Sequence, residues 1–200
     1  MSFEVVPAGP SHGPGLLALF QRTGSPCHCR WWHFDGDKNA WLDRCANRAS
    51  ESRAELAARV AEGHAEARGV VAVDADQAVV GWMKVCEALT VPKLFEQRLY
   101  KGLACFDGDR SSTWVIGCFL IDEPWRRRGV ARALLAGGIE LARNSGATHV
   151  EAFPRRAEDV PAEQLWTGPS AIFDALGFTT VHDFAPYPVL RLTLRSGSAG

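Results

Sequence analysis

The segment PWRRRGVARALLA, residues 124–136, joins three consecutive arginines to a glycine and then to a small, apolar stretch. A helix N-terminus has unpaired N–H groups and a partial positive charge, so it binds anions. Gly129 lets a ligand approach the backbone without a Cβ in the way, and guanidinium groups pair with phosphate oxygens. The segment predicts a pyrophosphate cradle, although a solvated arginine turn without a ligand explains the same residues. The three arginines are Arg126, Arg127 and Arg128.

A helix from about Val130 to Asn144 is predicted behind the arginines. Its apolar stripe repeats at helical period, so one face must lie on a sheet. Gly137 and Gly138 each cost about 1 kcal/mol relative to alanine, which close backbone packing would offset. Val130 has no side-chain oxygen to cap the first turn, so its amides remain available to a ligand. The stripe consists of Ala131, Leu134, Leu135, Gly138, Ile139 and Ala142.

The order of predicted elements indicates an α/β fold built on a mixed sheet. Ser52 followed by Glu55 has the spacing of a capping box and predicts a helix start. Strands are expected at 3–7, 69–74, 78–85, 112–122, 148–153, 178–184 and 189–194. Helices are expected at 15–22, 37–49, 52–62, 92–103, 130–144 and 170–176.

Length and composition favour one cytoplasmic domain over residues 1–194, with a helical insertion at 23–68 and a flexible tail at 195–200. The chain has 200 residues, of which 46% are hydrophobic and 22% charged. A formal net charge of -1 argues against a general nucleic-acid binder. We find neither a signal peptide nor an apolar run long enough to span a membrane.

Cys27, His28 and Cys29 offer ligands for a metal, and a metal-thiol sensor is therefore one alternative function. A structural zinc site needs four ligands, usually in two spaced pairs, and only Cys45 or His33 is available to assist. We expect no metal and favour a buried or cleft-lining thiol pair.

The run Arg126-Arg127-Arg128-Gly129-Val130-Ala131 resembles the R/Q-x-x-G-x-G/A signature of the GCN5-related N-acetyltransferases, and AIFDALGF at 171–178 resembles a later helix of that family. An N-terminal CxC segment followed by aromatic residues is similar to a bacterial subgroup of these enzymes. Further likenesses to that subgroup are Val80-Gly81-Trp82, Cys118-Phe119 and Glu151-Ala152-Phe153-Pro154.

The resemblance implies a mostly antiparallel sheet, flanked by helices, whose two central strands splay apart to admit the thioester of acetyl-CoA. Residues 118–121 and 149–153 would then face each other across this co-substrate. The backbone of Phe119, Leu120 and Ile121 would bind the pantetheine arm. The backbone amides of Arg127, Arg128, Gly129, Val130 and Ala131 would hold the pyrophosphate.

The implied reaction is direct acetyl transfer to a small-molecule or peptide amine. Strand alternation puts Glu151 on one face with His149 and Phe153, so Glu151 is the favoured base, while a salt bridge to an arginine is its alternative role. Glu87 is the reserve base on the substrate side.

Phe173 stands at a cofactor-site position where the family often has a tyrosine that protonates the departing sulfur. Phenylalanine has no proton to donate, which makes a non-catalytic acyl-CoA-binding module the first alternative.

The acceptor side of the family's fold corresponds here to the insertion. The resemblance thus places Cys27, Cys29, Trp31, Trp32 and Trp41 near the thioester, where aromatic rings bind an amine by cation–π contact or exclude water. A small satellite core would explain the same aromatic residues.

Cys118 lies inside an apolar strand, so we expect it to be an unreactive packing residue. We expect a monomer or a homodimer, without nucleic acid or membrane partners.

Overall fold

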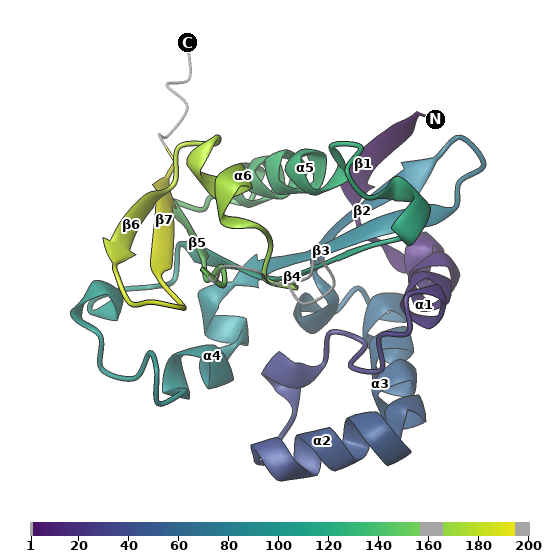
Figure 1. The fold of residues 1–200 in the computed structure, drawn as a ribbon, viewed down its shortest axis with the longest axis horizontal. Helices are drawn as coiled ribbons and strands as arrows, with labels where there is room; N and C mark the ends of the chain where they lie inside the picture. The colour runs from purple at the N-terminus through teal and green to yellow at the C-terminus, as the bar shows by residue number, and fades with distance from the viewer. Residues whose placement is uncertain (1, 157–165, 195–200) are drawn as a thin grey trace.

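A single seven-stranded sheet in the order β1-β2-β3-β4-β5-β7-β6 organises the chain (Figure 1). The computed structural model describes residues 2–156 and 166–194, so the predicted tail at 195–200 lies outside the described residues. Every neighbouring pair of strands is antiparallel except β4 and β5, which are parallel. The expected mostly antiparallel α/β sheet is confirmed. The strands are β1 (Phe3–Pro7), β2 (Gly69–Asp74), β3 (Val79–Glu87), β4 (Thr113–Ile121), β5 (His149–Ala152), β6 (Thr179–His182) and β7 (Val189–Thr193).

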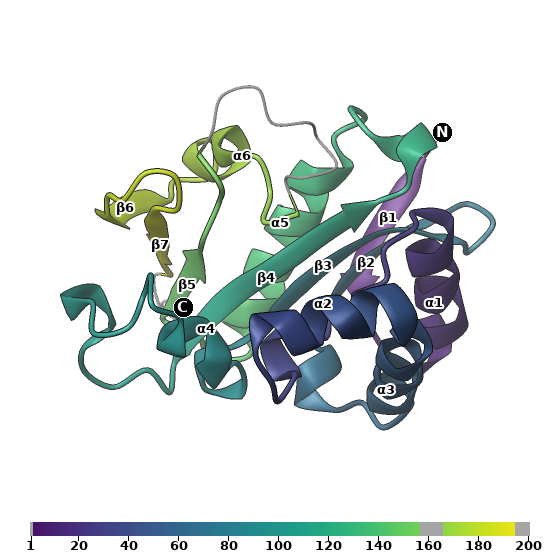
Figure 2. The ribbon, with the colours of Figure 1, turned by 60° about the horizontal axis from the view of Figure 1, so that its bottom comes forward.

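Helices cover both faces of this sheet (Figures 1 and 2). Helices α5 and α6 pack on one face, and α1 to α4 lie on the other. Among the described residues, no helix is long and apolar enough to cross a membrane. The helices are α1 (Gly13–Arg22), α2 (Lys38–Asn47), α3 (Ala49–Ala61), α4 (Pro92–Glu96), α5 (Val130–Asn144) and α6 (Ser170–Asp174).

Helix α5 begins and ends where its sequence pattern predicts. Its apolar stripe is buried against β1 to β4, with Ala131 at the margin. A Cβ at Gly138 would collide with Met83, and one at Gly137 would lie 2.6 Å from Cγ1 of Val5. The two glycines therefore allow the close helix-to-sheet packing that the sequence suggests.

Strand β4 carries the irregularity that opens the sheet. Its register with β3 shifts so that Gly117 is an extra residue between the partners of Lys84 and Val85, which forms a β-bulge. Strand β4 pairs with β5 only through Thr113–Val115, although β4 continues to Ile121. The strands part beyond this point (Figure 2), and the expected splay is confirmed.

The predicted start of α3 and the predicted end of α4 differ most from the structure. Helix α3 begins at Ala49 instead of Ser52, because the single residue Arg48 joins it to α2. Ser52 thus lies inside the helix, where its buried hydroxyl has no partner in the described structure, and it does not form a capping box. Helix α4 ends at Glu96, because Gln97 leaves helical geometry (φ −59°, ψ 139°).

Candidate active site

The start of α5 is an exposed, uncapped helix N-terminus. Gly129 adopts a left-handed conformation (φ 82°), and no atom lies within 4 Å of the position that a Cβ would occupy. No side chain caps the first turn, and its first helical hydrogen bond runs from the Ala133 amide to the Gly129 carbonyl. The preceding first-turn amides therefore have no side-chain cap, and such amides suit an approaching anion.

The three arginines differ in their local contacts. The Nε of Arg126 donates to the carbonyl of Ile121 (3.3 Å), and the Nε of Arg128 donates to the carbonyl of Pro124 (2.8 Å). Arg127 is exposed and left-handed (φ 56°). Arg127 and Arg128 are both exposed, which fits a phosphate cradle and a solvated turn equally well.

The edge of β4 beyond the splay already has a protein partner. The amide of Phe119 donates to the carbonyl of Trp166 (2.6 Å), while the carbonyl of Ile121 accepts from Arg126. Gly168 follows Trp166 in a left-handed conformation (φ 88°), and a Cβ there would lie 2.8 Å from the Phe119 ring. A pantetheine arm bound to the Phe119 amide would therefore displace the Trp166 carbonyl.

Phe173 lies in an entirely apolar setting on α6. Its buried ring packs edge-on against Phe119 (centroids 6.2 Å apart) and Phe178 (5.3 Å). This aromatic cluster has no proton to give to a departing thiolate.

Glu151 is 0% exposed and is held by two arginines. Its Oε2 accepts from Arg110 (2.6 Å) and its Oε1 from Arg191 (2.6 Å). Val150 and Ala152 point to the α5 side, so the predicted strand alternation is confirmed. The ion-pair alternative exists in the structure, and the role of Glu151 as a base stays a prediction. Glu87, the reserve candidate, pairs with Arg68 at the end of β3.

The CxC segment brings a thiol to β4. His28 and Cys29 are both left-handed (φ 44° and 56°), which is uncommon outside glycine. Burial alone raises the pKa of the Cys29 thiol, but a hydrogen bond with Cys118 and the charge of Lys84 outweigh it and lower this pKa to about 7. The Cys29 hydrogen bond and burial raise the pKa of Cys118. A buried thiol pair therefore joins the insertion to β4.

The structure gives no support to a metal site in this segment. The His28 ring stacks on Phe20 (centroids 5.1 Å apart), and its Nδ1 contacts the carbonyl of Pro26 (3.0 Å). Across the described ranges 2–156 and 166–194, no three His, Cys, Asp or Glu side chains gather in a way that would hold a metal ion.

The predicted aromatic wall separates into two parts. The Trp32 Nε1 lies 3.1 Å from where a Gly117 Cβ would be, and its ring pairs with Trp166 (6.0 Å). Trp31 and Trp41 instead pack together, and the Lys93 ammonium lies 4.2 Å from the Trp31 ring centroid. Trp32 therefore faces the splay, whereas Trp31 and Trp41 form a small satellite cluster around Lys93.

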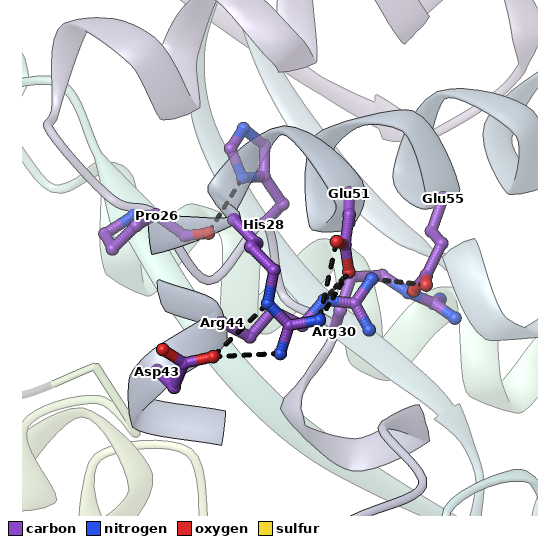
Figure 3. Close-up of polar contacts among 8 residues, drawn as sticks. Pro26, His28, Arg30, Asp43, Arg44, Glu51 and Glu55 are labelled. Atoms are coloured by element: carbon purple, nitrogen blue, oxygen red, sulfur yellow. Dashed lines mark hydrogen bonds and ion pairs between the residues drawn. The ribbon is translucent and has the colours of Figure 1, made fainter. Parts of the chain in front are cut away.

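An ion network around two buried arginines fixes the CxC segment to α2 and α3 (Figure 3). Glu55 accepts hydrogen bonds from both Arg30 and Arg44, whose side chains are almost fully buried. A second carboxylate, Glu66, accepts from Arg30 at 2.6 Å. The insertion is thus held by charge pairs that join residues far apart in the sequence.

Sequence reasoning missed several residues that shape this site. Gly117 and Lys84 lie in apolar runs, where only an isolated glycine and an isolated lysine mark them. Nothing local marks the partners of Glu151, because they come from a loop and from β7. The missed residues are Lys84, Arg110, Gly117, Trp166 and Arg191.

Comparison with known proteins agrees with this architecture. The model of the acetyltransferase (GNAT) family matches residues 31–167, and the chain belongs to that family. A comparison with curated proteins finds no match.

Solved structures share the fold at low sequence identity. The PaiA N-acetyltransferase of Thermoplasma acidophilum, in complex with coenzyme A, aligns with TM-score 0.55 at 10% identity, covering 97% of this chain and 100% of that one. YncA of Salmonella typhimurium, with acetyl-CoA, gives 0.54 at 14% identity over 100% and 98%. A GCN5-related N-acetyltransferase from Kribbella flavida gives 0.55 at 17% over 96% and 98%.

Proposed function

We propose that this protein is an acetyl-CoA-dependent N-acetyltransferase that transfers the acetyl group directly to an amine. The observation that carries the proposal is the open turn at Gly129, which in a chain of this family lies between a long strand and a long helix. Two of the structural neighbours contain coenzyme A or acetyl-CoA. The residues at the start of α5 fit a diphosphate, because amides and guanidinium groups are both available there.

The cofactor residues of this proposal follow the splayed edge of β4. The first-turn amides up to Ala131, with the arginines at 126–128, would hold the pyrophosphate. The backbone of Phe119, Leu120 and Ile121 would hold the pantetheine arm once the Trp166 carbonyl has moved. Phe173 would pack beneath that arm.

Acetyl-CoA supplies a thioester that an amine attacks directly. The protein must then stabilise the oxyanion, for which we propose a backbone N–H at the β4 bulge, and it must accept a proton from the amine. Glu151 is the proposed base, with Glu87 in reserve. Because both Glu151 oxygens already bind guanidinium groups, proton transfer to it would compete with those ion pairs.

The acceptor would enter from the face that carries α1 to α4. Residues 23–68, with Cys27, Cys29, Trp31 and Trp32, would form its wall within one domain over 1–194. We take the CxC segment as the mark of a bacterial subgroup. The acceptor is a small-molecule or peptide amine, and we expect a cytoplasmic monomer or homodimer that binds neither nucleic acid nor membrane.

A non-catalytic acyl-CoA-binding module is the second candidate. The observation that favours it is Phe173, whose apolar cluster lacks the family's usual proton donor.

Calorimetry with acetyl-CoA, followed by release of free CoA thiol in the presence of an amine panel, separates the two candidates. Binding and amine-dependent CoA release support the enzyme, whereas binding without release supports the module.

Glu151→Gln then tests the proposed role of Glu151 as the base. We expect slower turnover with unchanged acetyl-CoA affinity, and an unchanged rate at every pH would remove Glu151 from this role.

A further inference from the structure

Lys84 on β3 is a buried cation that pairs with no carboxylate among the described residues. It is 1% exposed, and its ammonium donates to the backbone carbonyl of Glu66 (2.5 Å). In the described part of the chain no carboxylate forms an ion pair with it. An ammonium has three donors, and a buried charge without a counter-ion is costly. Lys84 therefore needs an explanation other than stability.

The Lys84 side chain packs against β4 at the bulge. A Cβ at Gly117 would lie 2.9 Å from the Lys84 Cδ, so the side chain fits there only because residue 117 is glycine. Gly117 lies just beyond Val115, where β4 leaves β5. Lys84 thus lies at the entrance of the splay, on the side that carries the insertion.

The groups around Lys84 leave its charge largely uncompensated. Glu66 directs its carboxylate to Arg30 and Arg59. Burial, followed by the charges of Lys84 and Arg30, lowers the pKa of His33 to about 3, so this imidazole is neutral. The titratable and charged groups that face Lys84 are Cys29, Arg30 and His33 from the segment before α2, Glu66 from the turn before β2, and Cys118 from β4.

Cys29 shows what the Lys84 charge does to sulfur. Although burial raises the pKa of this thiol, the Cys118 hydrogen bond and Lys84 lower it to about 7. After the Cys118 hydrogen bond, the Lys84 charge is the next cause that lowers the pKa of this buried thiol.

We propose that Lys84 is a catalytic residue that stabilises the departing CoA thiolate, the leaving group to which Phe173 has no proton to give. This inference rests on the proposed function. As the C–S bond breaks, its electron pair goes to sulfur, which leaves as a thiolate beside the Lys84 ammonium. The acceptor nitrogen, which has formed the new C–N bond, gives its proton to the proposed base, Glu151. The products are the acetamide, the CoA thiolate and the proton on the base, so protons and electrons balance.

The test compares CoA with desulfo-CoA, which lacks the sulfur, and requires no acceptor. Calorimetry of both ligands from about pH 6 to about pH 9 covers the range below and around an ordinary thiol pKa. If Lys84 lowers the pKa of the bound CoA thiol, this thiol ionises at a pH where the thiol of free CoA does not. In the native protein the affinity of CoA, divided by that of desulfo-CoA, should then rise with pH by up to about tenfold per pH unit.

Three variants assign that rise to Lys84. Lys84→Met keeps the apolar chain and should make the ratio independent of pH. Lys93→Met removes a lysine from the same face and should leave the rise intact. Cys29→Ser removes the neighbouring thiol, which itself titrates, and should also leave the rise of the ratio intact. Thermal unfolding checks that each variant is folded; Lys84→Met should be at least as stable as the native protein, since it removes an unpaired buried charge.

A flat ratio in the native protein, or a rise that persists in Lys84→Met, overturns the inference while CoA binding still supports the proposed function. Failure of both ligands to bind overturns the proposed function and this inference with it.

Discussion

The start of α5 and the segment in front of α2 serve opposite sides of the proposed reaction, and they are built differently. The first is one continuous stretch in which the proposed site consists of backbone amides and a left-handed glycine. The second gathers side chains from several distant segments, held by ion pairs of the buried Arg30 with the partly exposed Glu55 and Glu66. A site made by local backbone can be predicted from sequence, whereas a site made by tertiary contacts cannot.

The strongest test of the backbone half is Gly129→Glu. A carboxylate over the first turn of α5 should repel the diphosphate and reduce CoA affinity by about a hundredfold or more, equivalent to roughly 3 kcal/mol. Calorimetry measures this loss. Gly146→Glu is the matched control, because Gly146 is also left-handed (φ 81°) with no atom within 4 Å of its Cβ position. Equal loss in both variants would remove the anion site from Gly129.

The side-chain half is tested by Glu151→Gln, which breaks the buried pairs to Arg110 and Arg191. We expect the free energy of unfolding to fall by about 3–5 kcal/mol, because two guanidinium groups lose their counter-charge. Denaturant unfolding measures it. Glu140→Gln breaks an exposed pair with Arg143 and should cost at most about 1 kcal/mol. A similar small cost for both variants would contradict a structural role for the buried cluster.

The stability of the segment in front of α2 should decrease in acid because of His33. Burial, with the charges of Lys84 and Arg30, lowers the folded-state pKa of His33 to about 3, from its ordinary value of 6.5. The folded protein thus binds fewer protons than the unfolded chain, so stability should decrease as pH falls from 6.5 towards about 3. His33→Asn should flatten this decrease in urea titrations, while His182→Asn should not. A parallel pH profile for His33→Asn and the native protein would refute the assignment.

The sequence predicts much of the fold because its signals are local. The apolar stripe of α5, the hairpin of β2 and β3 and the long buried β4 each follow from residues close together in the chain. The start of α3 was wrong because the capping-box spacing of Ser52 and Glu55 competes with tertiary contacts. In the structure Ser52 is buried and Glu55 pairs with arginines.

The candidate site divides in the same way. Gly129 and its neighbours were identified from spacing, and the alternation that directs Glu151 away from α5 followed from strand period. The arginines that hold Glu151, and Trp166 at the edge of β4, come from segments that only the folded chain brings together.

Gly168→Ala tests whether the segment with Trp166 and Gly168 leaves the Phe119 amide when acetyl-CoA binds. Alanine at φ 88° adds roughly 1–2 kcal/mol of strain to the segment that occupies this amide in the ligand-free chain. If that segment moves on binding, acetyl-CoA affinity should rise severalfold in calorimetry. Gly177→Ala has similar strain (φ 83°) away from Phe119 and should leave affinity unchanged. A weaker affinity in Gly168→Ala would show that the segment keeps its place on binding.

The smallest expected effect concerns Ser52→Ala. Its buried hydroxyl has no partner in the described structure, so alanine should stabilise the protein by about 0.5–1 kcal/mol in thermal or chemical unfolding. A helix cap at Ser52 would instead make the variant less stable by about 1 kcal/mol. The sign of the change therefore decides between the sequence pattern and the structure.

The backbone amide shifts of the labelled protein, followed by NMR as CoA is added, test the central claim most directly. We predict that the amides of Gly129, Val130 and Ala131 shift most and saturate together with the binding isotherm. Saturating CoA that leaves these three amides unmoved would contradict the assignment of the start of α5 as the diphosphate site.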